Sequence, residues 1–187
     1  MTLAKDALKE LPAKAPEGLK HLLEELVESM SSEDRDYFTP AQLADVAQTH
    51  WDLAQKRTNG EPKLKIYTQE DSNTGMRSTF IDIVSDDLAF LVDSVAAEIN
   101  KNSFLIDLLL HPILYVKYDA KGNLQDTAVK QKKDSLLQSH IHVQIKDIPP
   151  EKNLKELEQG LFETVNDVQI SNSRSEEHTS ELQSRTN

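Results

Sequence analysis

The stretch Ser85-Asp86-Asp87-Leu88-Ala89-Phe90-Leu91-Val92-Asp93-Ser94-Val95 joins a strand to a helix and decides the fold of this chain. Before it, Thr79–Val84 is rich in β-branched and aromatic residues, which favours a strand. After it, apolar residues recur at the spacing of one helix face, at Leu88, Leu91, Val92, Val95 and Ile99. We therefore predict a helix from Asp87 to about Lys101, with Asp86 and Asp87 as its N-terminal capping residues.

The residues around this unit predict further strands and a second amphipathic helix. Lys63–Thr68 alternates in polarity and is expected to pair with Thr79–Val84 through a turn at Asn73-Thr74-Gly75. Phe104–Lys117 is apolar on both faces, which predicts a central strand. Its apolar residues are assigned to two faces, Phe104, Ile106, Leu108 and Leu110 on one, Leu105 and Leu109 on the other. His140–Ile145 alternates strictly, and a helix follows with Leu154, Leu157, Leu161, Phe162 and Val165 on one face.

The first 58 residues predict a helical hairpin. One helix carries apolar residues at Leu19, Leu22, Leu23, Leu26 and Val27. A second helix should begin with Thr39 as N-cap and Pro40 at its first position, and run to about Lys56. On it, Trp51 is interpreted as a core anchor and His50 as a packing residue. A turn-rich boundary at Thr58–Pro62 then separates residues 1–58 from a domain at 62–170.

The order strand, strand, helix, strand, strand, helix predicts an α+β fold. We expect a ferredoxin-like antiparallel sheet with helices on one face, preceded by the helical hairpin. The last strand of that fold, which pairs beside the first, is missing from the predicted order. We expect Lys63–Thr68 to take its edge position by pairing with Thr79–Val84.

Three motifs carry a resemblance to a known family: Asp86-Asp87-x-x-Phe90-Leu91-Val92-Asp93-Ser94-Val95, the His111-Pro112 pair, and Asp119-x-x-Gly122-x-Leu124. Over roughly residues 60 to 170 the chain resembles the amino-terminal region of the large bacterial NAD-specific glutamate dehydrogenases. The resemblance implies an ACT-type regulatory module, far from the catalytic and NAD-binding parts of such an enzyme. It also implies contacts with other domains or subunits of the parent, in a homo-oligomer.

The same resemblance directs attention to one turn as a candidate effector site. ACT modules that bind amino acids do so between the first strand and first helix, which here corresponds to Ser85, Asp86, Asp87, Ala89 and Phe90. The usual glycine is absent, and two carboxylates would compete with an anionic ligand for backbone N–H groups. Two functions stay open: a non-catalytic regulatory or assembly module, and an amino-acid sensor that acts within the same parent or alone. An independent metal-dependent protein that uses His140 and His142 is a third alternative.

The carboxy-terminal residues do not resemble a folded segment. Arg174–Ser184 is similar to a translated DNA-sequencing adapter, and we expect residues 171–187 to form a disordered tail of artefactual origin. A genuine polar tail is the alternative, because the same composition would remain solvated in any protein.

Composition excludes several classes of function. The formal net charge of −11 argues against nucleic acid and anionic membranes as partners. Without cysteine or an apolar amino-terminal segment, the chain is expected to be cytoplasmic. The sequence contains no GxGxxG, GxxxxGK[ST], GxSxG or HExxH motif, so we assign it no catalytic and no cofactor-binding residue.

Histidines and one aspartate could still bind metal. His140 and His142 project from the same strand face, but the sequence places no third ligand beside them. Asp107 and His111 would lie roughly 13 Å apart on an extended strand, too far to chelate one ion. We therefore predict no metal site, and expect Asp107 to find a hydrogen-bond donor across the sheet.

Overall fold

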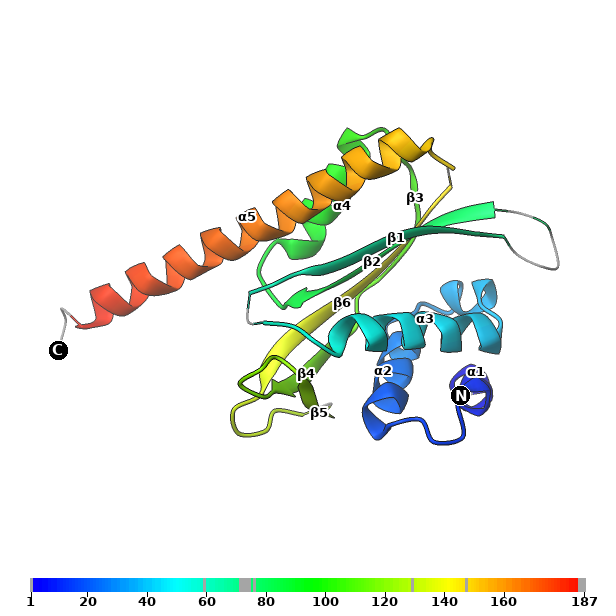
Figure 1. The fold of residues 1–187 in the computed structure, drawn as a ribbon, viewed down its shortest axis with the longest axis horizontal. Coiled ribbons are helices and arrows are strands. Elements are labelled where there is room, and N and C mark those ends of the chain that lie inside the picture. Colours follow the sequence, from blue (N-terminus) through cyan, green and yellow to red (C-terminus); the bar gives the residue numbers. More distant parts are fainter. Residues whose placement is uncertain are drawn as a thin grey trace.

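A six-stranded sheet lies between two helical layers in the computed structural model (Figure 1). The structure describes residues 2–58, 60–70, 75, 77–128, 130–146 and 148–184, with side chains described up to residue 173. The helices are α1 (Thr2–Glu10), α2 (Glu17–Glu28), the 3₁₀ helix η1 (Asp34–Tyr37), α3 (Pro40–Ala54), α4 (Leu91–Lys101) and α5 (Glu151–Ser184). The strands are β1 (Lys63–Glu70), β2 (Arg77–Asp86), β3 (Ile106–Leu110), β4 (Ile113–Tyr118), β5 (Leu124–Ala128) and β6 (Leu136–Ile145).

The strand order is β1-β2-β6-β4-β5, with β3 paired to the other half of β6. Every pairing is antiparallel, which confirms the predicted α+β class. β1 pairs with β2 in the register Lys63↔Val84, so the predicted hairpin and the edge position of β1 are confirmed. Asn73 and Thr74 of the predicted turn lie outside the described residues.

The predicted strand Phe104–Lys117 is two strands in the structure. The break falls at His111 and Pro112, where proline cannot donate to a ladder. The predicted faces of this segment are also wrong, because the register shifts between Ile106 and Leu108. Ile106 and Leu109 lie on the side of α4 and α5, whereas Leu108 and Leu110 lie on the other side. Leu105 precedes β3 and is exposed. Strand β5 has no counterpart among the strands that the sequence analysis predicted.

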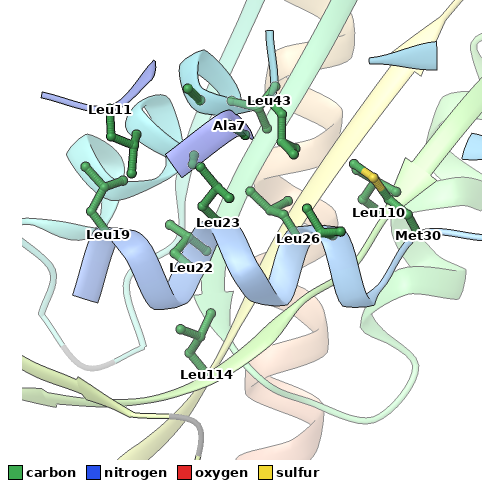
Figure 2. Packing of buried hydrophobic residues seen from close by; sticks show 14 of the residues in the cluster. Ala7, Leu11, Leu19, Leu22, Leu23, Leu26, Met30, Leu43, Leu110 and Leu114 are labelled. Atoms are coloured by element: carbon green, nitrogen blue, oxygen red, sulfur yellow. The ribbon is translucent and has the colours of Figure 1, made fainter. Parts of the chain in front are cut away.

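Two hydrophobic cores hold the layers together. The first lies between α1, α2, α3 and strands β3 and β4, where leucines of α2 pack toward Leu110 and Leu114 (Figure 2). The second lies between the sheet and helices α4 and α5, with Ile141, Val143 and Ile145 at its centre. Residues 2–10 add a helix, α1, that the sequence analysis did not predict.

The amino-terminal end of α3 confirms the predicted cap. The Thr39 hydroxyl accepts a hydrogen bond from the Gln42 amide at 3.2 Å, and Gln42 Oε1 accepts one from the Thr39 amide at 2.9 Å. This reciprocal capping box fixes where α3 starts. Trp51 packs against the first core, as expected for an anchor.

Helix α5 continues to Ser184, where the sequence led us to expect a disordered tail from residue 171. Glycine and proline are absent after Gly160, and glutamate, glutamine and leucine favour helix, so nothing in the sequence ends α5 earlier. The adapter origin of the tail stays a prediction. Among the described helices, none combines the length and the apolar character that crossing a bilayer requires.

Adjacent residues of α5 offer a test of the second core. Leu161 is fully buried, whereas Phe162, which the sequence placed on the same face, is 43 % exposed. Leu161→Ala should lower the free energy of unfolding by about 2–5 kcal/mol, because it leaves a cavity between α5 and the sheet. Phe162→Ala should cost about 1 kcal/mol or less. Urea denaturation measures both, and equal losses would contradict the packing described.

Candidate functional site

The turn proposed for an effector does not begin a helix where the sequence predicted. Helix α4 starts at Leu91, and its N-cap is Phe90 in the left-handed region at φ 65°, with no side-chain capping hydrogen bond. The predicted capping by Asp86 and Asp87 is therefore wrong. Both carboxylates instead bind groups that are distant in the sequence, which the local pattern could not reveal.

Asp86 binds the segment that connects helix α3 to strand β1. Its carboxylate accepts hydrogen bonds from Arg57 Nη2 at 2.6 Å and from the Gly60 amide at 3.1 Å. Arg57 is only 3 % exposed and also donates to the Glu61 carbonyl at 2.7 Å. A charged pair with this much burial and this many partners fixes the path of the connection. Arg57, Asp86 and Tyr118 also line a cavity of about 320 Å³.

Asp87 belongs to a second polar chain, which gives His111 a role. Ser139 Oγ donates to Asp87 Oδ1 at 2.7 Å, and His111 Nε2 lies 2.8 Å from the same hydroxyl. Because the serine proton is used by Asp87, His111 Nε2 must be the donor to Ser139. Burial lowers the pKa of His111, and the opposing effect of Asp87 is smaller, so the neutral imidazole is favoured.

The remaining residues of the turn offer little to a ligand. Ser85 is buried, and its hydroxyl donates to the Asp86 carbonyl at 3.1 Å. Phe90 is 76 % exposed, and the Ala89 carbonyl accepts a hydrogen bond from Asn172 of α5 at 3.5 Å. The structure thus brings the five predicted effector residues together, but their polar groups are used in internal contacts.

A different group of ionisable residues is fully buried beneath α3. His50 on α3, Asp82 on β2 and His142 on β6 each have no exposed surface. Asp82 Oδ1 lies 2.6 Å from His142 Nδ1 and 3.2 Å from His50 Nε2. Asp82 and His142 are direct partners in the register of β2 and β6, and α3 places His50 over both. We call His50, Asp82 and His142 the buried triad.

Burial and charge act in opposite directions on the buried triad and its neighbours. Burial alone would raise the pKa of Asp82, but His50 and His142 outweigh it and hold that pKa below its usual range. Burial lowers the pKa of His140 well below the usual value, so this imidazole is neutral. Burial and the charge of Asp82 raise the pKa of the Tyr67 hydroxyl.

The sequence analysis identified only part of this cluster. His140 and His142 do share a face, as predicted, but His50 was interpreted as a packing residue and Asp82 was not singled out. The available signal was a carboxylate inside the apolar strand Thr79–Val84, where burial demands a partner. Asp107 has the cross-sheet donor that the sequence predicted, because Lys146 Nζ lies 3.1 Å from its carboxylate.

A cavity of about 440 Å³ lies next to the buried triad, between α3 and strands β1 and β2. Four acidic residues and several aromatic rings line it, among them Asp45, Glu70, Tyr67 and Phe80. The Phe80 ring stacks on Tyr67 on one side and on His142 on the other, with ring centroids 5.4 and 5.5 Å apart. This lining favours a ligand that carries positive charge, and disfavours an anion.

The antiparallel sheet and its helices define an α+β protein, consistent with an ACT-type module. Comparison with known families identifies it further: the chain belongs to the glutamate dehydrogenase ACT1 domain family, whose model matches residues 22–161. The match includes the second half of α2 and all of α3, which the sequence analysis had assigned to a separate segment.

Two curated relatives are NAD-specific glutamate dehydrogenases. The enzyme of Pseudomonas aeruginosa is 28 % identical over 142 residues, which cover 72 % of this chain and 9 % of the relative. That of Halomonas elongata is 27 % identical over 122 residues, covering 63 % of this chain and 8 % of the relative. The chain thus spans less than a tenth of either. No solved structure matches it significantly.

The contact between Arg57 and Asp86 can be tested by mutation. Arg57→Ala removes the donor to Asp86 and to the Glu61 carbonyl, and should lower the free energy of unfolding by about 2–3 kcal/mol. Lys132→Ala, which removes an exposed ion pair with Asp126, is the control and should cost less than about 1 kcal/mol. Comparable losses in chemical denaturation would show that Arg57 does not fix the connection.

Proposed function

We propose that this chain is a non-catalytic regulatory and assembly module from the amino-terminal region of an NAD-specific glutamate dehydrogenase. The observation that carries the proposal is the family match over residues 22–161, in a chain that covers less than a tenth of its relatives. The parent would oxidise L-glutamate to 2-oxoglutarate and ammonia with NAD, using residues outside this module. A chain without cysteine suits a cytoplasmic enzyme.

Exposed apolar residues support a role in assembly. Helices cover much of both faces of the sheet, but apolar side chains stay exposed where β4 pairs with the start of β6. Ile113, Leu136 and Leu137 lie on the paired strands β4 and β6, and each is at least 38 % exposed. Strands β1 and β5 end the sheet, and unpaired edges are sites for pairing with another chain. Other domains or subunits of the parent are the partners that we propose for these surfaces.

A standalone amino-acid sensor is the second candidate. The cavity between α3 and the strands β1 and β2 favours it, because a volume of about 440 Å³ could accept a small ligand. The turn Ser85–Phe90 argues against it, since Asp86 and Asp87 are already held by Arg57 and Ser139. We therefore rank the assembly module first.

The nucleotide sequence of the source genome across the codons from Asn166 to Asn187 tests the proposal directly. We expect the reading frame to diverge from the present tail after about Val168 and continue into a long frame that encodes a dinucleotide-binding segment. A stop codon directly after the present tail would instead favour the standalone sensor.

Thermal unfolding with amino acids separates the two candidates. A sensor saturated at about 100 times its dissociation constant would gain about 2.7 kcal/mol, which corresponds to a rise in Tm of about 5–10 °C. For the assembly module we expect no amino acid to raise Tm by this amount in one enantiomer alone. An enantiomer-specific shift of that size would overturn the ranking of the two functions.

A further inference from the structure

We propose that His50, Asp82 and His142 bind a divalent zinc ion that fastens helix α3 to the central strands of the sheet. The two imidazoles and the carboxylate come from three elements, α3, β2 and β6, and none is exposed to solvent. This proposal concerns a site at the interface of the helical layer and the sheet, and it does not depend on the role of the module in a parent enzyme.

The donor atoms are close enough to share one ion. One ligand atom from each residue lies within 4.8 Å of the other two. Ligands about 2.0–2.1 Å from a tetrahedral zinc are separated from one another by about 3.3 Å. Asp82 Oδ1 and His50 Nε2 already have a separation of 3.2 Å, whereas His142 Nδ1, at 2.6 Å from the same oxygen, would move away by less than about 1 Å.

Unpaired donor and acceptor atoms are the second reason to place an ion here. His50 Nε2 lies 3.2 Å from a carboxylate oxygen but without good hydrogen-bond geometry, and Asp82 Oδ2 has no well-directed hydrogen bond among the described residues, although the Tyr67 hydroxyl lies near the carboxylate. Buried polar atoms in native proteins are nearly always satisfied, by protein, by water or by an ion. A cation bound by Asp82 Oδ1 and the two imidazoles would satisfy His50 Nε2, and it would also satisfy Asp82 Oδ2 where the carboxylate binds through both oxygens.

The donor set and the surroundings select the kind of ion and its role. Two imidazole nitrogens and one carboxylate oxygen suit zinc, whereas calcium and magnesium prefer oxygen ligands alone. The rings of Phe38 and Phe80 lie beside His142, with centroids 6.2 and 5.5 Å from that of the imidazole. Because the three side chains have no exposed surface, a substrate could not reach the ion, and its role would be structural.

The unmutated chain provides the first test. The 187-residue chain, purified without chelators, should contain about one zinc ion per chain by plasma mass spectrometry. After removal of the metal, Co²⁺ should bind with a stoichiometry of one and give the intense visible absorption of tetrahedral coordination. Readdition of Zn²⁺ should raise Tm. A chain that contains no zinc and takes up no Co²⁺ would show a hydrogen-bonded His–Asp–His network and overturn the proposal.

Variants locate the ion. Loss of a group that hydrogen-bonds a metal ligand lowers metal affinity by about 10–100-fold, and loss of the ligand itself should lower it further. His142→Ala and Asp82→Asn remove ligands, so they should weaken Co²⁺ binding by at least about 100-fold. His140→Ala is the matched control, because His140 lies on the same strand and face and is 2 % exposed, yet is outside the buried triad. It should retain stoichiometric Co²⁺. Equal binding by His142→Ala and His140→Ala would refute the assignment. Circular dichroism checks the fold of each variant. If a variant unfolds, the Co²⁺ titration of the unmutated chain still decides whether the chain binds a metal ion.

Discussion

The central position of β6 is the constraint on which the rest of the structure depends. This strand pairs with β2 along one side and with both β3 and β4 along the other, so its two faces become the two faces of the whole sheet. Ile141, Val143 and Ile145 point to one core, and His140 and His142 point to the other side. Because side chains alternate along a strand, neither set can be moved without moving the other.

This alternation would suit a sheet with one face in water. Antiparallel sheets commonly expose their polar face, and β2 and β6 have the pattern for it, with Asp82 beside His142. Here α3 covers that face instead, and its own His50 faces the same carboxylate. Covering charged groups with a helix is costly unless they are paired. The contacts within the buried triad therefore offset the cost of covering these polar groups when α3 packs on the sheet.

The same principle explains why the turn at the end of β2 is not free for an effector. Asp86 and Asp87 each bind a group far away in the sequence, Arg57 for the first and Ser139 for the second. These contacts hold the connection from α3 and the start of β6 against the end of β2. Residues that an ACT module can use for ligand recognition are here used to join parts of the fold. Fold alone does not determine function, and the contacts at this turn support an architectural role.

The sequence by itself determined the elements whose patterns are local: the α3 cap at Thr39, the β1–β2 hairpin, the apolar face of α4 and the alternation of β6. It could not determine the register shift between Ile106 and Leu108, the start of α4 at Leu91 or the buried triad, because each depends on partners at long range. A carboxylate such as Asp86 has the same local signature whether it caps a helix or binds Arg57, and His50 reads as a packing residue until β2 and β6 lie beneath it. Only the tertiary structure decides between these outcomes, because the energy of a buried charge is set by the groups that surround it in space.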